Sequence, residues 1–347
     1  MTGLRLGFFT RLLDEGDAAT RYRLALAQIR HAEACGFDSA WVAQHHFHAA
    51  EGGLPAPFVF LAQAAALTSR IRLGTGIVTL PLELPIRVAE DAAVLDILSQ
   101  GRVELGVGSG GNPEAFAAFG LQDADRRAVF ARKLAELVAA LDQKALAGGD
   151  RVYPPHPSLG QRLWYATFSV DGAQAAGQLG AGLLLSRTQP RPKTAPDASL
   201  AEIQEPMIDA YLAALPPGTA PRILASRSVF VADDRAEAWR LAEAGLRRFD
   251  ARLVAQGRLP DAPRTLEEII RRQDSHLGTV AEVTESLAAD RVLARATELA
   301  VQVHSIDPPH AHTLRSIELV AQGVAPALGW QRQHRPPIAQ QAGVAAQ

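Results

Sequence analysis

The stretch Ile71–Gly111 reads I-R-L-G-T-G-I-V-T-L-P-L-E-L-P-I-R-V-A-E-D-A-A-V-L-D-I-L-S-Q-G-R-V-E-L-G-V-G-S-G-G, and it decides the expected fold. An apolar strand leads into a glycine-rich turn, a helix and a tight turn, and a second strand then ends in a second glycine cluster. Strands that alternate with helices run parallel, so both glycine clusters are expected at one rim of an α/β protein. Backbone exposed there without side chains can closely approach a flat, anionic ligand.

The composition is that of a globular protein. The chain has 347 residues, of which 48% are hydrophobic and 21% charged, with a formal net charge of −2. Without a surplus of lysine and arginine we expect no nucleic-acid binding, and no window has the roughly 20 apolar residues of a membrane helix. We recognise no signal peptide, and the single cysteine, Cys35, allows no internal disulfide. We therefore expect a cytoplasmic protein in which Cys35 is a small, buried hydrophobic residue.

Short apolar runs separated by helical patterns predict a (β/α)8 TIM barrel. Helical spacing fills the intervals between the runs, with Pro57 and Pro85 in first turns and Gly36 as a stop signal. A doubly wound open sheet with a second domain is the alternative. The expected strands are residues 4–9, 38–43, 71–79, 102–107, 162–167, 182–186, 222–231 and 299–304.

The chain is longer than a minimal barrel, which takes about 250 residues. We expect insertions at about 186–220, where several prolines including Pro206 interrupt regular structure, and at about 250–290, where extra helical segments precede the last strand. Residues 1–335 are thus expected to form one domain, followed by a flexible tail at 336–347.

Histidines follow the second expected strand, and a barrel carries its active site at the carboxyl ends of its strands. Adjacent side chains on extended backbone point to opposite sides, so only one of His45 and His46 can face the pocket. That histidine is a candidate acid–base or oxygen-stabilising group, and the other packs structurally. The pair His46 and His48 could also bind a metal ion together with His304, although no carboxylate set at the strand ends completes such a site.

Glycines occupy the ends of the third and fourth strands. Gly74-Thr75-Gly76 interrupts the third strand, which indicates a bulge, a close approach by a ligand, or a packing glycine. The cluster Gly106-x-Gly108-x-Gly110-Gly111 lacks the spacing of a dinucleotide-binding fingerprint, so we interpret it as a rim loop free of side chains.

Three further positions have two readings each. Glu90, on the helix after the third strand, lies one turn beyond Arg87 and is either an ion-pair partner or a site carboxylate. Ser169 opens the helix after the fifth strand, where it is either an N-cap or part of a phosphate site. Arg187, after the sixth strand, either reaches the same anion or lies on the surface.

Three motifs resemble those of the flavin-dependent bacterial luciferase-like monooxygenases. They are W-V-A-Q-H-H-F at 41–47, R-L-G-T-G-I-V-T-L-P at 72–81 and L-D-I-L-S-Q-G-R-V-E-L-G-V-G-S-G at 95–110. The resemblance covers nearly the whole chain and is strongest over 38–120 and 163–186. It implies a TIM barrel that uses reduced FMN, delivered by a separate flavin reductase, and O2 to oxidise a small organic substrate. A homodimer is also implied.

The resemblance assigns roles residue by residue. His45 matches a mouth histidine that acts as a base or stabilises an intermediate, and Glu90 matches a carboxylate near the flavin ring. Thr75 and Gly76 match a bulged strand that supports the ring, often through a non-proline cis peptide. Ser169 matches a hydroxyl that binds the FMN phosphate.

Three cofactor-binding positions depart from the family pattern. Gln44 stands where the true luciferases have glutamate, Ser109 stands where they have an arginine near the phosphate, and Gly172 replaces a hydroxyl residue. Arg187 is the candidate that compensates for the missing phosphate contacts. Light emission is not expected.

The sequence therefore favours an FMN-dependent, two-component monooxygenase, with residues 188–206 as a candidate mobile lid. Two alternatives within the same superfamily are a deazaflavin-dependent hydride-transfer enzyme and a non-catalytic flavin-binding barrel. Metal-dependent hydrolysis is a third alternative.

Overall fold

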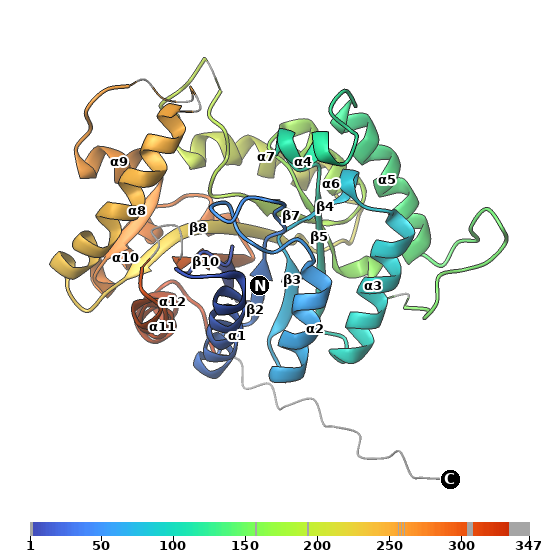
Figure 1. Ribbon diagram of the computed structural model, residues 1–347, viewed down its shortest axis with the longest axis horizontal. Coiled ribbons are helices and arrows are strands. Elements are labelled where there is room, and N and C mark those ends of the chain that lie inside the picture. The colour runs from blue at the N-terminus through green and yellow to red at the C-terminus, as the bar shows by residue number, and fades with distance from the viewer. Residues whose placement is uncertain are drawn as a thin grey trace, which may run out of the picture.

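Parallel strands form the centre of the molecule, and helices surround them (Figure 1). The computed structural model describes residues 3–156, 158–192, 194–255, 257, 259, 261–303 and 308–332. The strands are β1 (Arg5–Thr10), β2 (Ser39–Val42), β3 (Arg72–Thr75), β4 (Val78–Thr79), β5 (Val103–Gly108), β6 (Leu163–Ala166), β7 (Gly182–Leu185), β8 (Ile223–Val231), β9 (Ser275–Gly278) and β10 (Glu298–Gln302).

The predicted TIM barrel is confirmed. All pairings described are parallel, and β10 pairs with both β1 and β8, which closes the ring. Each of the eight expected strands lies at its predicted place. The expected strand 71–79 is divided into β3 and β4, which both pair with β5 and form one position of the barrel. The open-sheet alternative is therefore wrong.

The helices begin and end where local chemistry favours it. Pro57 and Pro85 occupy first helical turns, and Gly36 ends α1 with φ 99°. The helices are α1 (Ala18–Cys35), α2 (Pro57–Leu67), α3 (Pro85–Leu98), α4 (Pro113–Ala118), α5 (Arg126–Leu141), α6 (Val170–Gln178), α7 (Leu200–Ala214), α8 (Arg235–Ala255), α9 (Leu266–Arg272), α10 (Val280–Ala288), α11 (His310–Leu319) and α12 (Ala325–Ala327). Among the described residues, no helix is both long and apolar enough to cross a membrane.

Both expected insertions contain more regular structure than the sequence indicated. Pro206 does not interrupt structure, because it lies inside α7, whose start is fixed by a capping box between Ser199 and Glu202. The region 250–290 contributes the strand β9 as well as helices. This strand pairs with the carboxyl half of β8, and its sequence S-H-L-G is too short and polar to be recognised as an apolar run. The predicted tail at 336–347 lies outside the described residues.

Cys35 is only partly buried, which corrects the expectation of a fully buried residue. It occupies the last position of α1, where its Sγ lies 3.7 Å from Nε2 of His31. Its apolar part packs against the main core cluster.

Two indole rings fill the middle of the barrel. Trp41 of β2 and Trp164 of β6 meet edge to face at 5.5 Å, although their strands are not neighbours, so the contact crosses the interior. Each indole lies against a glycine of the next strand along the barrel. A Cβ on Gly74 would lie 2.2 Å from Trp41, and a Cβ on Gly182 would lie 2.3 Å from Trp164.

Charged side chains close the amino-terminal end of the barrel below the indoles. The carboxylate of Glu298 accepts a hydrogen bond from Trp41 Nε1 at 2.8 Å, and that of Glu104 accepts one from Trp164 Nε1 at 2.7 Å. Arg5 lies between the two carboxylates, 3.4 Å from Glu298 and 3.8 Å from Glu104. This network fixes both indoles and lies opposite the carboxyl-terminal end of the barrel.

Candidate functional site

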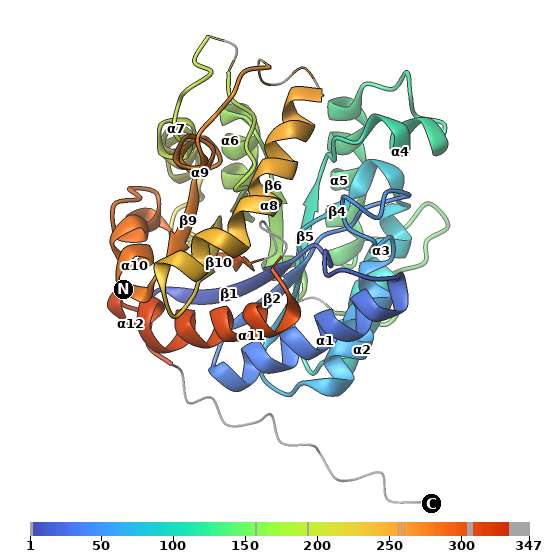
Figure 2. The same cartoon turned by 60° about the vertical axis from the view of Figure 1, so that its left-hand side comes forward.

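Loops from several strands meet at the carboxyl-terminal mouth of the barrel, and Glu51 holds them together. Its carboxylate pairs with Arg252 of α8 and accepts a hydrogen bond at 2.9 Å from Asn112, the N-cap of α4. Its carbonyl oxygen accepts one at 2.5 Å from Arg11, just beyond β1. Figure 2 shows α8 rising obliquely in front of the strands. The helix thus reaches the loops after β2 and β5 through Arg252.

His45 lies on the loop after β2, among these contacts, and its imidazole is neutral. Its backbone N–H donates to the carbonyl of Leu54 at 3.0 Å. Burial lowers the pKa of His45 to about 3, and the positive charges of Arg11 and Arg252 and the neighbouring His46 contribute in the same direction. A bound anion at the mouth would oppose these charges and raise that pKa.

His46 and His48 point to different partners, so the structure separates the predicted metal ligands. The ring of His46 packs edge to face on Phe119 at 5.1 Å, and burial lowers its pKa. His48 pairs with Glu114 of α4 at 2.9 Å. His304 lies outside the described residues. Within the described part of the chain, no three metal-binding side chains form a cluster.

Gln44, just after β2, forms hydrogen bonds with the end of β4 and with the turn that follows it. Its Oε1 accepts a hydrogen bond from the backbone N–H of Thr79 at 2.7 Å, and its Nε2 donates to Pro55 O at 3.0 Å and Glu83 Oε1 at 2.7 Å. All three bonds go to protein groups. In this structure the side chain therefore shapes the mouth, and its predicted role in cofactor binding stays a prediction.

Thr75 and Gly76 lie at the point where the third barrel strand bends. The Thr75 hydroxyl accepts from the N–H of Gly106 and donates to its carbonyl, both at 2.8 Å, so it replaces two ladder bonds between β3 and β5. The peptide bond between Gly76 and Ile77 is cis, as the resemblance implies for this strand. A Cβ on Gly76 would lie 2.6 Å from the ring of Phe9.

The glycine clusters are less open than the sequence indicated. Trp41 fills the space beside Gly74, as described above, and the Thr75 carbonyl fills that beside Gly106 at 2.1 Å from an added Cβ. Only Gly111, at the far end of the second cluster, has no atom within 4 Å of an added Cβ. Close packing therefore explains Gly74 and Gly106, and the side-chain-free rim is confined to the loop that ends in Gly111.

Ser109 lies in that loop, where its hydroxyl makes one long hydrogen bond of 3.5 Å to the carbonyl of Gly110. Gly110 has φ 67°, and a Cβ there would lie 2.3 Å from Thr79. The loop is thus pinned by the turn after β4, and the Ser109 side chain has spare hydrogen-bonding capacity.

Ser169 is the N-cap of α6. Its Oγ accepts a hydrogen bond from the N–H of Gly172 at 3.1 Å and lies 3.4 Å from the hydroxyl of Thr167. A Cβ on Gly172 would lie 2.0 Å from Thr167 Oγ1. The hydroxyl of Thr167, which no motif indicated, thus lies beside Gly172 and Ser169.

Arg187 turns toward the barrel mouth. Its Nε donates to Oε1 of Gln302 at the end of β10 at 2.8 Å, and its Nη1 donates to the hydroxyl of Ser228 on β8 at 3.0 Å. The guanidinium therefore bridges two strand ends, and the predicted contact with the anion held at Ser169 stays a prediction.

Glu90 pairs with Arg87 at 2.5 Å on α3, and the same guanidinium contacts Asp91 at 2.8 Å. These are the ion pairs that helical spacing predicts. No contact described for Glu90 joins it to the group around His45, and its predicted position near the cofactor stays a prediction.

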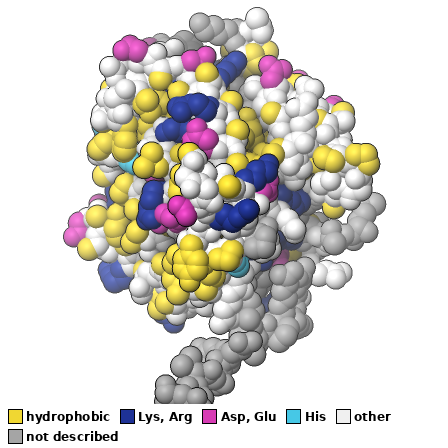
Figure 3. Space-filling model, turned by 90° about the vertical axis from the view of Figure 1, so that its right-hand side faces the viewer, with side chains coloured by type: hydrophobic (Ala, Val, Ile, Leu, Met, Phe, Trp, Pro, Cys, Tyr) yellow, Lys and Arg dark blue, Asp and Glu magenta, His cyan; other side chains and the backbone are white. Residues whose placement is uncertain are grey.

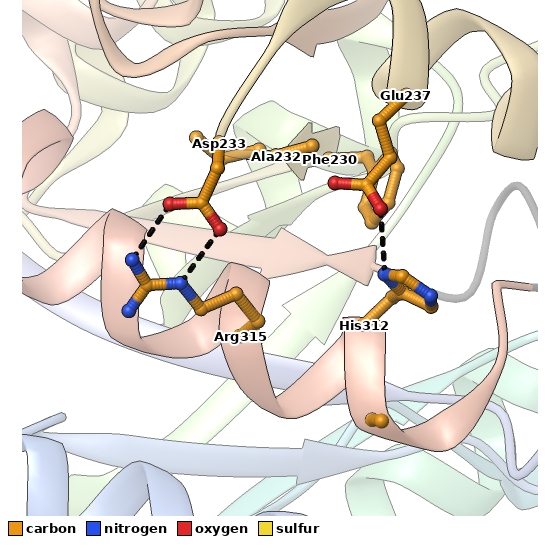
Figure 4. A pocket seen from close by; sticks show the side chains of 8 residues that line it. Phe230, Ala232, Asp233, Glu237, His312 and Arg315 are labelled. Atoms are coloured by element: carbon orange, nitrogen blue, oxygen red, sulfur yellow. Dashed lines mark hydrogen bonds and ion pairs between the residues drawn. The ribbon is translucent and has the colours of Figure 1, made fainter.

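A hollow of about 260 Å³ lies away from these residues, between the end of β8 and α11 (Figure 4). Two ion pairs cross it, Asp233 with Arg315 at 2.7 Å and Glu237 with His312 at 3.6 Å. Since both acidic groups are already paired, the hollow is best explained as a joint between α8 and α11.

Comparison with known proteins identifies the family. The family model described as luciferase-like monooxygenase matches residues 5–313. The chain belongs to this family. It is 32% identical over 317 residues to 4-hydroxyprotoasukamycin monooxygenase of Streptomyces nodosus subsp. asukaensis, a match that covers 84% of this chain and 82% of that protein. It is also 31% identical over 195 residues to limonene 1,2-monooxygenase of Rhodococcus erythropolis, covering 51% of this chain and 48% of that one.

Solved structures of the luciferase-like fold agree with this identification. The monooxygenase RslO1 from Streptomyces bottropensis superimposes with a TM-score of 0.78 at 25% identity, covering 93% of this chain and 99% of that one. The oxygenating constituent of 3,6-diketocamphane monooxygenase from Pseudomonas putida, in complex with FMN, gives 0.71 at 20% identity, with 93% and 98% covered. An F420-dependent reductase from Methanopyrus kandleri shares the fold at a TM-score of 0.66 and 17% identity, with 94% and 99% covered. The predicted family is confirmed, and the relatives identify the chain as a monooxygenase enzyme.

Proposed function

We propose that the protein is an FMN-dependent, two-component monooxygenase that inserts one oxygen atom of O2 into an apolar organic substrate. Reduced flavin would come from a separate reductase. The proposal is supported by three features at the carboxyl ends of the parallel strands: a neutral imidazole after β2, a bend in the third strand and a hydroxyl-capped helix after β6. When bound, reduced FMN supplies the chemistry that activates O2.

The residues at the mouth fit such a cofactor. Gly76 and Gly108 face the interior, beside Phe9 and Ile77. A planar ring bound beside them would contact apolar side chains and backbone. The amino terminus of α6 offers the hydroxyls of Ser169 and Thr167 together with a helix dipole suited to a phosphate.

Each residue then has a distinct task. Gly76 admits the side chain of Phe9 beside the bent strand, and Thr75 holds that strand against β5. His45, neutral in the free protein, can accept a proton or donate a hydrogen bond at the ring edge. Ser169 binds the phosphate, while Gln44 and Glu51 hold the loops that exclude water from the mouth. Ser109, Gly172, Arg187 and Glu90 remain candidate cofactor contacts.

The relatives suggest the substrate class. Limonene and 4-hydroxyprotoasukamycin, the compounds in the relatives' names, point to organic substrates with substantial apolar surface. We extend this class, and not either compound, to the present chain.

We further propose a cytoplasmic homodimer. Apolar side chains are exposed along α2, α3 and the turn before α3, and such a face is typical of a protein contact. Figure 3 views the side on which α3 and α5 lie in Figure 1, and it shows hydrophobic side chains gathered in patches among charged ones. The exposed residues are Val59, Leu67, Leu84, Ile86, Val94, Ile97 and Leu98.

A deazaflavin-dependent hydride-transfer enzyme is the second candidate, because F420-dependent enzymes share this fold. Anaerobic titration with reduced FMN and with reduced F420, followed by fluorescence, separates the two. A flavin-binding barrel without activity would bind FMN but consume no O2 when a reductase, NADH and apolar substrates are supplied.

The phosphate site gives the test of FMN binding. Ser169→Ala is expected to weaken FMN binding by roughly 1–3 kcal/mol, because it strands a phosphate partner. The same change removes a helix cap, so Thr279→Ala, which removes the N-cap of α10, is the matched control. Both variants should lose about 1 kcal/mol of stability, but only Ser169→Ala should lose FMN affinity. Equal affinity in both variants would refute the phosphate site.

A further inference from the structure

Three aromatic rings lie together at the rim of the mouth. His46 packs on Phe119 at 5.1 Å and on Phe47 at 5.8 Å, and the two phenyl rings lie 6.3 Å apart. We call these three residues the aromatic lip. Phe47 is 66% exposed and Phe119 is 45% exposed, so both phenyl rings are accessible to solvent.

The lip is held by the loops that also carry the catalytic candidate. His48 pairs with Glu114, and Asn112 donates a hydrogen bond to Glu51, so two contacts join the loop after β2 to α4. His46 directly follows His45 in the chain. The backbone that carries the rings is therefore held near the imidazole at the mouth.

Stability alone does not favour a phenylalanine at position 47. Its backbone has φ 67°, in the left-handed region that is unfavourable for a non-glycine residue, and its exposed ring buries little surface in return. Strained, exposed residues of this kind concentrate at functional sites.

The lip also contains a polar atom that lacks a partner. Nε2 of His46 is buried beneath the rings and has no hydrogen-bond partner among the described residues. Buried polar atoms are nearly always satisfied, so a ligand that carries its own hydrogen-bonding group is a natural partner for this nitrogen.

We propose that the aromatic lip is a substrate-binding subsite for a cyclic or aromatic group that bears a hydroxyl or carbonyl. The ring system stacks on Phe119 and displaces the exposed Phe47 ring while remaining in contact with it, so that the oxygen reaches Nε2 of His46, which is buried in the free protein. This inference rests on the proposed function, because it takes the lip to present a substrate to the reaction centre beside His45. The three ring centroids lie within 6.3 Å of one another, an extent that suits a small molecule better than a protein surface.

Binding of 2-naphthol, measured by its fluorescence anisotropy, tests the subsite. Each ring contact is expected to account for about 2- to 12-fold in Kd, so Phe47→Ala/Phe119→Ala should raise Kd about 5- to 150-fold. Phe47→Leu/Phe119→Leu keeps the apolar volume, guards against misfolding, and should raise Kd by a smaller factor. Leu212→Ala, at an exposed apolar site on α7, should leave Kd unchanged. His46→Phe should weaken 2-naphthol but not naphthalene.

Several outcomes would overturn the subsite. The first is that the wild-type protein does not bind 2-naphthol, and the second is that the Kd is unchanged in both double variants. The third is that His46→Phe changes the Kd values of 2-naphthol and naphthalene by the same factor. A lower sedimentation coefficient in the alanine double variant would instead identify the lip as a protein contact. FMN titration of the same variants keeps the two proposals separate. FMN binding by the wild type, with a naphthol Kd unchanged in both double variants, refutes the lip alone. A naphthol Kd that depends on the lip, in a protein that binds no FMN, refutes the proposed function and leaves the lip as a binding site without a role in that reaction.

Discussion

Replacing His45 by asparagine is expected to make the protein less sensitive to mild acid. In the folded chain the pKa of His45 is about 3, whereas an unperturbed histidine titrates at 6.5. Between these values the unfolded chain binds one proton more than the folded chain, so this histidine lowers the free energy of unfolding as the pH falls. Asparagine does not titrate, and its variant lacks this contribution.

The magnitude follows from the two pKa values. Linkage gives a penalty near zero at pH 7.5 and about 1.4 kcal/mol at pH 5.5, where the unfolded imidazole is about nine-tenths protonated. The penalty at pH 5.5 depends little on the pKa of His45 in the folded chain, because any such pKa below about 4.5 leaves the imidazole neutral at that pH.

Urea unfolding of both proteins at pH 7.5 and pH 5.5 provides the assay. The wild type should lose about 1.4 kcal/mol more than His45→Asn between the two pH values, because contributions from all other groups cancel in the comparison. An equal loss in the two proteins would show that His45 is not buried as a neutral ring, and the reasoning about the mouth would fail.

The barrel interior and the apolar face lead to two further predictions. Gly74→Ala should lower the free energy of unfolding by about 2 kcal/mol or more in a urea titration, because its Cβ would lie 2.2 Å from the fixed indole of Trp41. Gly111→Ala, with open space around its Cβ, should change it by less than about 0.5 kcal/mol, and similar losses in both would contradict this packing. The proposed homodimer should sediment as a dimer at micromolar concentration and dissociate in Ile97→Glu on α3, whereas a monomeric wild type would exclude it.

The barrel could be predicted because its strands and helix ends are indicated by patterns within short stretches of sequence. Parallel strands covered on both faces are continuous apolar runs, and Pro57, Pro85 and Gly36 mark helix ends regardless of tertiary context. The strand β9 could not be predicted in this way. Its short sequence acquires strand structure only through pairing with the carboxyl half of β8.

The mouth was only partly predictable, because its contacts join distant residues. The alternation of His45 and His46 followed from extended backbone, but Glu51 and Arg252 are 201 residues apart and carry no shared local signal. The glycines show the same limit. Gly74 looked like a place for a ligand to approach, yet the side-chain alternation of two adjacent strands places Trp41 directly against it.

The most direct test of the central claim follows the His45 imidazole by NMR while reduced FMN is added under anaerobic conditions. If the anionic cofactor occupies the mouth, the His45 ring resonances should shift with one-to-one saturation, and the pKa of His45 should rise from about 3. Saturable FMN binding with unchanged His45 resonances and pKa would contradict the account, because the cofactor would then lie elsewhere.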